Sequence, residues 1–77
     1  GEEFLLILPR TGSVQAVRVA ERIRREITDR ARPGEITVTI SGGVAELGGH
    51  SPEGLVREAD KRMYRAKQRG KDRIVAE

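Results

Sequence analysis

The chain has 77 residues, with 15 Lys or Arg against 12 Asp or Glu, and its formal net charge of +3 favours anionic ligands. The lack of cysteine excludes disulfides and thiolate metal sites, and the scarcity of aromatic residues excludes a stacking platform for single-stranded nucleic acid. No apolar run reaches membrane-spanning length and the first residues do not resemble a signal peptide, so we expect a cytoplasmic protein with no membrane or nucleic-acid partner.

The first predicted elements are a strand and a helix. Residues 3–8 form an apolar run closed by Pro9, which is typical of a buried strand. After a turn, Thr11 or Ser13 offers a side-chain oxygen that can cap a helix. Apolar residues then recur at three- and four-residue spacing to about residue 30, and they predict one helical stripe made of Val14, Val17, Ala20, Ile23 and Ile27.

A second strand is predicted after the breaker Pro33-Gly34. Residues 36–41 alternate between apolar and hydroxyl-bearing side chains, which is the pattern of a half-buried strand. Gly42-Gly43 interrupts this alternation and indicates a bulge or a close approach of two backbones. Val44-Ala45 can continue the strand beyond the interruption.

The last predicted elements are a helix and a short strand. Ser51 is a natural N-cap and Pro52 a natural first helical residue, while Gly70 suits the position just past the helix end. The apolar residues between these ends predict a buried stripe of Leu55, Ala59, Met63 and Ala66, with Tyr64 in the core or at its edge. A strand over residues 72–76 closes the order β-α-β-α-β.

Three stretches of the sequence together are similar to one known family. The first is Gly1-Glu2-Glu3-Phe4 with the apolar run after it, and the second is Val-Thr-Ile-Ser-Gly-Gly-Val-Ala at residues 38–45. The third is Ala-Asp-Lys-Arg-Met-Tyr-Arg-Ala-Lys at residues 59–67, followed by Gly-Lys-Asp-Arg at residues 70–73. In this order they resemble the signature hairpin, the Ser-Ile-Gly-Val-Ala strand and the Ala-Asp-x-x-x-Tyr-x-Ala-Lys-x-x-Gly-Arg-Asn segment of the GGDEF family of diguanylate cyclases.

The resemblance implies a fold and an extent. Gly42 stands where the family usually has a branched apolar residue, and Lys71 replaces its usual Arg. The signature starts here at its second Gly, so we expect residues 1–77 to be the C-terminal portion of a single GGDEF domain with the N-terminal half absent. The implied fold class is α+β, a β-α-β-α-β fragment of the ferredoxin-like nucleotidyl-cyclase palm fold, with an antiparallel or mixed sheet and the helices on one face.

The family joins two GTP molecules into cyclic dimeric GMP with Mg²⁺, which implies a metal site at the start of this chain. By resemblance, Glu2 is the candidate catalytic residue, as a metal ligand and possible proton acceptor, and Glu3 is a second metal-site carboxylate. Gly1 would let the backbone turn tightly beside the nucleotide. Taken alone, these residues are more typical of an exposed N-terminal stub with two solvated glutamates, and only the other two stretches favour a metal site.

Two lysines stand at positions that resemble the family's phosphate contacts. Lys67 is in the last turn of the second predicted helix and Lys71 lies just past its end, where an ammonium group could reach a triphosphate. Lys71 in place of Arg would keep the charge and lose bidentate phosphate geometry. The alternative for Lys67 is a simple favourable interaction with the C-terminal end of the helix.

Two functions remain open from the sequence. One is an enzyme fragment, the carboxyl half of a diguanylate cyclase, which we expect to be inactive alone and to bind GTP weakly or not at all. The other is a non-catalytic dimerising or structural module derived from a GGDEF domain. We also expect a strand-exchanged homodimer, because the strands at 3–8 and 36–45 would have unpaired edges that a second copy can fill.

Overall fold

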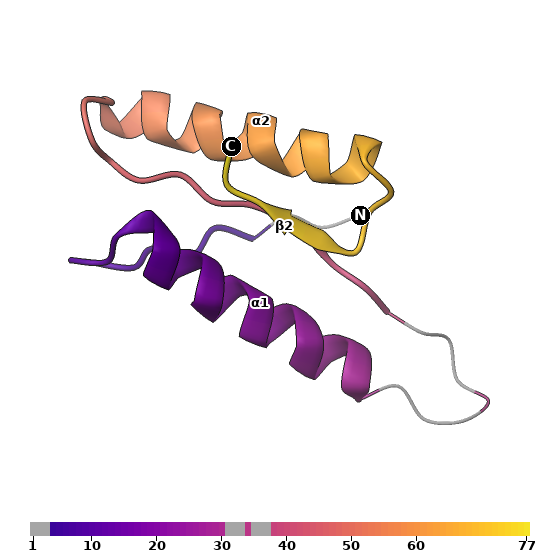
Figure 1. The fold of residues 1–77 in the computed structure, drawn as a ribbon. Coiled ribbons are helices and arrows are strands. Elements are labelled where there is room, and N and C mark those ends of the chain that lie inside the picture. The colour runs from indigo at the N-terminus through magenta and orange to yellow at the C-terminus, as the bar shows by residue number, and fades with distance from the viewer. Residues whose placement is uncertain (1–3, 31–33, 35–37) are drawn as a thin grey trace.

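The structure is a computed structural model that describes residues 4–30, 34 and 38–77 (Figure 1). Within these residues the elements are helix α1 at Ser13–Asp29, strand β1 at Ser41–Gly43, helix α2 at Pro52–Gln68 and strand β2 at Arg73–Val75. Both predicted helices and the closing strand are confirmed, and the fold class is α+β. The second predicted strand is confirmed only in part, because among its described residues the strand covers Ser41–Gly43 and not residues 38–40 or 44–45. Neither of these helices is long and apolar enough to cross a membrane.

Helix α1 begins without the side-chain cap that the sequence predicts. Its N-cap is Gly12, and the Thr11 hydroxyl donates instead to the Pro9 carbonyl oxygen at 3.0 Å. The Ser13 amide donates to Oε1 of Glu46 at 2.7 Å, so a carboxylate from the loop after β1 satisfies one of the free amides of the first turn. The predicted cap is wrong because an acceptor from a distant part of the sequence takes its place.

Helix α2 has the ends that the sequence predicts. The Ser51 hydroxyl oxygen accepts a hydrogen bond from the Gly54 amide at 3.1 Å, and Pro52 is the first helical residue. Gly70, just past the other end, has a φ of 119°, which a residue with a side chain rarely adopts. The predicted stripe faces the strands, since Ala66 is fully buried and the other members are half-buried, namely Leu55, Ala59 and Met63.

The sheet in the described part of the chain consists of β1 and β2 running parallel, with Ser41 opposite Arg73 and Gly43 opposite Val75. The Val44 amide extends this pairing by donating to the Val75 carbonyl oxygen at 2.9 Å. The expected antiparallel or mixed sheet is therefore not confirmed. Helix α2 returns the chain to the starting end of the sheet before β2 begins, and a crossover of this kind makes the two strands parallel.

The apolar run at the start of the chain is not a strand at residues 4–8. Four of its side chains point outward, with exposed fractions of 90% for Phe4, 64% for Leu5, 58% for Leu6 and 74% for Ile7. A strand exists through hydrogen bonds to a neighbouring strand, and residues 4–8 have none to another described residue. The prediction of a buried strand is wrong for these residues in a single copy, and residue 3 lies outside the described part.

The two strands lie between the two helices (Figure 1). Helix α1 packs on β2, whereas α2 packs on both strands. The helices were expected on one face, and the structure corrects this. Gly43 shows how closely α2 packs on its face of the strands, because a Cβ there would overlap the backbone of Ala59 and Met63. The backbone of α2 thus occupies the space directly against the strands on that face, and α1 covers the other.

Gly42, the residue before Gly43, lies against a side chain of the neighbouring strand. A Cβ at Gly42 would lie 2.9 Å from Cδ1 of Ile74, its partner in the parallel pairing. The Ile74 side chain therefore occupies space that the family's usual branched residue at position 42 would need. The close approach of two backbones predicted at Gly42-Gly43 is confirmed at Gly43, whereas Gly42 meets only a side chain of the neighbouring strand.

The core is small. In the described residues only Ala66 and Val75 are buried apolar residues. Arg62 adds a polar tie between α2 and the end of β1, since its Nη1 donates to the Val44 carbonyl oxygen at 2.8 Å. Its Nε lies 3.3 Å from Oε1 of Glu58, close enough for charge attraction although no hydrogen bond forms there. Stability in this chain depends on few contacts, so each is expected to matter.

Candidate functional site

The predicted metal-site residues Gly1, Glu2 and Glu3 lie outside the described residues. Their roles stay predictions. Across residues 4–30, 34 and 38–77, no group of three or more His, Cys, Asp or Glu side chains is arranged to hold a metal ion. The described part therefore supplies no metal centre of its own.

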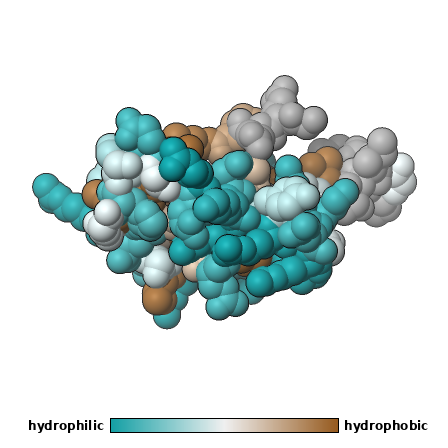
Figure 2. Space-filling model, turned by 90° about the horizontal axis from the view of Figure 1, so that it is seen from above, coloured by the Kyte–Doolittle hydropathy of each residue, from teal (hydrophilic) through white to brown (hydrophobic). Residues whose placement is uncertain are grey.

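Lys67 is exposed in the last turn of α2. It borders a shallow depression on the outer side of the helix, together with Asp60 and Tyr64. Tyr64 is 61% exposed, so its predicted place in the core or at its edge is wrong. Figure 2 shows the molecule from the α2 side, where most of the surface is hydrophilic and hydrophobic residues are scattered. An ammonium group here faces solvent and is free to meet an anion.

Lys71 lies three residues beyond the end of α2 and is also exposed. Its amide donates to the Ala66 carbonyl oxygen at 2.9 Å, which ties it to the last turn of the helix. The backbone places Lys67 and Lys71 within about one turn of each other, at the same end of α2. Lys71 does not border the depression beside Lys67, so the two lysines do not share a pocket.

The turn that carries Lys71 has an uncommon backbone. Lys71 and Asp72 have φ values of 63° and 48°, so two consecutive residues with side chains adopt the left-handed conformation. Asp tolerates this conformation better than most residues, whereas Lys does not. The Asp72 amide donates to the Ser41 hydroxyl oxygen at 3.2 Å, and Nε of Arg73 donates to the Lys71 carbonyl oxygen at 3.0 Å. The turn leads directly into β2.

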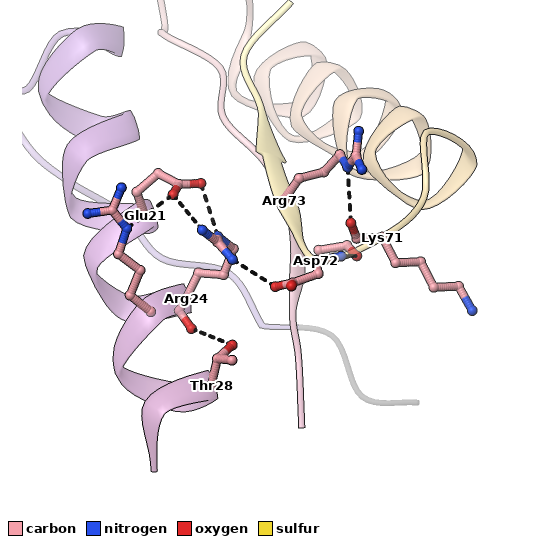
Figure 3. Close-up of polar contacts among 8 residues, drawn as sticks. Glu21, Arg24, Thr28, Lys71, Asp72 and Arg73 are labelled. Atoms are coloured by element: carbon pink, nitrogen blue, oxygen red, sulfur yellow. Dashed lines mark hydrogen bonds and ion pairs between the residues drawn. The ribbon is translucent and has the colours of Figure 1, made fainter. Parts of the chain in front are cut away.

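A cluster of charged groups joins this turn to α1 (Figure 3). Arg24 donates from Nε and Nη2 to the two carboxylate oxygens of Glu21, at 3.1 and 2.9 Å. Its remaining nitrogen, Nη1, donates to Oδ1 of Asp72 at 2.8 Å. Only 19% of the Arg24 side chain is exposed, compared with 43% for Asp72. One cation is thus shared between a carboxylate of its own helix and a carboxylate of the turn.

The cluster shifts the pKa values of Glu21 and Arg24. The hydrogen bond from Arg24 holds the pKa of the Glu21 carboxyl below its ordinary value. The same hydrogen bond, and then the one to Asp72, raise the pKa of the Arg24 guanidinium further above its ordinary range. Both shifts favour the charged forms, so the Arg24–Glu21 pair persists at neutral pH.

Sequence reasoning did not single out Arg24, Asp72 or Ser41. Arg24 lies four positions after Ala20 and three before Ile27 of the predicted apolar stripe, and this spacing places it on the same side of α1 as those residues. Its contact with Asp72 spans 48 positions of sequence, so no local pattern could reveal the pair.

The comparisons with known proteins concern these same positions. The sequence profile of the family described as "Diguanylate cyclase, GGDEF domain" matches residues 1–73. The chain belongs to the GGDEF domain family. The match to this GGDEF profile includes the signature positions at the start of the chain, both predicted phosphate-contact lysines and the Arg24–Asp72 pair.

Curated GGDEF relatives cover nearly all of this chain. Response regulator PleD of Caulobacter vibrioides is 40% identical over 82 residues, which are 97% of this chain and 18% of that protein. Diguanylate cyclase A of Treponema denticola is 38% identical over 80 residues, with coverages of 97% and 22%. Diguanylate cyclase DgcM of Escherichia coli is 40% identical over 77 residues, with coverages of 99% and 19%.

The GGDEF chain therefore spans about a fifth of the length of these relatives. No solved structure matches it significantly.

Proposed function

We propose that residues 1–77 form the C-terminal part of a diguanylate cyclase domain, the kind of domain that condenses two GTP molecules into cyclic dimeric GMP. In this proposal Glu2 and Glu3 contribute metal-site carboxylates, Glu2 also acts in catalysis, and Gly1 lies beside the nucleotide. Lys67 and Lys71 contact its phosphates. The observation that carries the proposal is the family match over residues 1–73, which includes all five positions.

The position of the two lysines supports a role in phosphate binding. Both are exposed at the same end of α2, and no ion pair to another described residue ties up either ammonium group. Free ammonium groups attract a triphosphate by charge, and this attraction weakens over about 8–10 Å at ordinary salt concentrations. Lys71 supplies a point charge where the family's Arg would make two parallel hydrogen bonds, so its contact is weaker and less directional.

The donor types at Glu2 and Glu3 suit Mg²⁺, which prefers carboxylate and phosphate oxygens. When bound, such an ion neutralises phosphate charge and makes a hydroxyl group easier to deprotonate. Glu2 and Glu3 would hold the ion through their carboxylates, and Lys67 and Lys71 would orient the nucleotide through their ammonium groups. Two adjacent carboxylates are a small ligand set, and we propose that a peptide of these 77 residues alone forms no product.

The decisive experiment titrates GTP with Mg²⁺ into the purified chain and follows binding by calorimetry at two salt concentrations. We expect weak, salt-sensitive binding that falls further in Lys67→Ala and in Lys71→Ala. The matched control is Arg57→Ala, which removes one exposed positive charge from α2 and does not border the depression beside Lys67. Equal losses in all three variants would mean nonspecific charge attraction, and tight binding insensitive to salt would contradict the proposal. Cyclic dimeric GMP produced by the pure chain would contradict its inactivity.

We also propose that the chain forms a strand-exchanged homodimer, which is the core of the second candidate function, a non-catalytic dimerising module. The exposed run Phe4–Leu5–Leu6–Ile7 supports it, because four consecutive apolar side chains in water are costly and the run has no backbone hydrogen bond to another described residue. In the dimer, residues 3–8 of each copy pair about a twofold axis.

Light scattering after size-exclusion chromatography tests the dimer. We expect twice the monomer mass at micromolar concentration, and a monomer for Leu6→Lys. The control is Val14→Lys, because Val14 is 70% exposed on α1 and lies outside the run. A monomeric mass for the unaltered chain would contradict the proposal.

A further inference from the structure

The conformation of the turn that carries Lys71 is held from three separate elements. The Lys71 amide is fixed to the last turn of α2 by the Ala66 carbonyl oxygen, and the Asp72 amide is fixed to β1 by the Ser41 hydroxyl oxygen. The Asp72 carboxylate is fixed to α1 by Arg24. A lysine with φ of 63° does not keep that conformation by preference, so these contacts must hold it.

Glu21, on the same helix, fixes the orientation of the Arg24 guanidinium group. Glu21 accepts from two of its nitrogens in the parallel arrangement that carboxylates and guanidinium groups favour. This leaves Nη1 as the nitrogen that faces Asp72, as Figure 3 shows. Since the Arg24 side chain is mostly covered, it has little freedom to follow Asp72 if the turn moves.

We propose that Arg24 and Asp72 are positioning residues for polyphosphate binding, which hold the exposed Lys71 in its left-handed conformation at the end of α2 that carries Lys67. The inference rests on the proposed function, since it assumes that Lys71 contacts phosphate. It assigns to Asp72 a role that its own charge opposes. A carboxylate next to an anion-binding lysine repels the anion, so only its effect on geometry can make it helpful.

The positioning role and the charge of Asp72 have opposite effects on anion binding, so substitutions of Asp72 can distinguish them. Asp72→Ala removes the acceptor for Arg24 and places a residue that disfavours the left-handed conformation, and it also removes a negative charge. Asp72→Asn removes the same charge but keeps an acceptor oxygen and a side chain that tolerates this conformation. A positioning role predicts that Ala weakens polyphosphate binding and that Asn largely preserves it. A charge effect predicts tighter binding in both variants.

The probe is inorganic triphosphate titrated without metal into the purified chain at low salt, which requires neither the Glu2 site nor catalysis. We expect Asp72→Ala to raise the Kd about three- to tenfold, and Asp72→Asn to stay within about twofold. In a Lys71→Ala background, Asp72→Ala should have no further effect, because it acts through Lys71. The three-bond coupling between the amide and α protons of residue 71, which reports φ, should change in Asp72→Ala and not in Asp72→Asn.

Arg24 gives an independent test with a matched control. Arg24→Ala should weaken triphosphate binding as Asp72→Ala does. Arg25→Ala removes the same charge from the same helix, where Arg25 is 72% exposed and lies 3.8 Å from Glu21 without touching the turn, so it should have a smaller effect. Arg24→Lys keeps the charge but cannot bind both carboxylates in this geometry, so it should also weaken binding, and it replaces Asp72→Ala if that variant fails to fold.

The outcomes distinguish this inference from the function on which it rests. If Lys71→Ala weakens triphosphate binding while Asp72→Ala and Arg24→Lys do not, the positioning role is wrong and the phosphate contact stands. If Lys71→Ala itself has no effect, the phosphate contact fails and the positioning role fails with it. Tighter binding in both Asp72 variants, with an unchanged coupling at residue 71, would also overturn the inference.

Discussion

Replacing Gly43 by Ala would place one methyl group between β1 and α2, where it meets backbone atoms. The new Cβ would overlap the carbonyl oxygen of Ala59 and the amide nitrogen of Met63, and it would lie 2.9 Å from the carbonyl carbon of Arg62. Carbon atoms pack without strain at about 3.5–4.0 Å, so the strand and helix would have to separate by roughly an ångström. No rotamer change can relieve the overlap, because the atoms in the way belong to the helix backbone.

The expected loss of stability is large for a chain of this size. Overpacking costs about 1–3 kcal/mol when side chains can adjust, and a backbone obstacle puts Gly43→Ala at about 3 kcal/mol, the upper end of this range. A folded chain of this length has about 4–12 kcal/mol of stability in total. The substitution should therefore remove a substantial part of it, and far-UV circular dichroism during urea unfolding measures the change in midpoint.

Two other glycines serve as controls for Gly43→Ala. Gly49 has no atom within 4 Å of an added Cβ and no left-handed φ, so Gly49→Ala should be neutral or stabilising by about 0.4–1 kcal/mol. Gly42→Ala meets only the flexible end of Ile74, at 2.9 Å, and should cost about 1 kcal/mol. A Gly43→Ala midpoint equal to that of Gly49→Ala would refute the close packing of α2 on β1.

Three further predictions concern polar contacts outside the phosphate positions. Glu21 has a lowered pKa, so its contribution to stability is complete above the ordinary glutamate pKa near 4.5 and is lost as the pH falls below that value. Glu21→Gln should therefore flatten the decline in the urea midpoint at acid pH. Glu46→Ala should cost about 1 kcal/mol by uncapping α1, and slower hydrogen exchange at the Ser13 amide than in the parent would contradict this. Arg62→Met keeps much of the side-chain volume but leaves the Val44 carbonyl oxygen unpaired, so thermal unfolding should show a loss of stability of about 1–3 kcal/mol. An unchanged Tm would mean that water replaces the guanidinium group as the hydrogen-bond donor.

The two helices show which parts of the fold the sequence can predict. Helix α2 is marked by its own residues, since Ser51, Pro52 and Gly70 act within a few positions of the helix ends. Helix α1 is predicted from its periodicity, yet its cap is not, because Glu46 lies 33 positions from Ser13. Helix ends that depend on neighbouring residues can be predicted from the sequence, whereas contacts between distant segments depend on the tertiary structure.

The sheet shows the same limit. An apolar run predicts that residues 3–8 prefer an extended, covered place, but it does not supply the neighbour that makes a strand. The described residues 4–8 are accordingly exposed in a single copy. The direction of β2 relative to β1 follows from the crossover through α2, which the residues of either strand do not encode.

The candidate site divides in a similar way. Motif resemblance identified Lys67 and Lys71, because the spacing from the end of α2 is a local property. It did not reveal that Arg24 contacts the turn that carries Lys71, since that contact joins the first helix to the segment just before the last strand. The signature carboxylates fall outside the described residues, so their roles remain predictions.

The contact between Gly42 and Ile74 bears on how this sequence could have diverged from its family. A branched residue at 42 and an isoleucine at 74 compete for one volume, so neither change is independent of the other. Losing the branched side chain first would leave a cavity, and gaining Ile74 first would create a clash. Homologues that retain a branched residue at position 42 should therefore carry a smaller side chain at position 74, and the two columns of an alignment should covary.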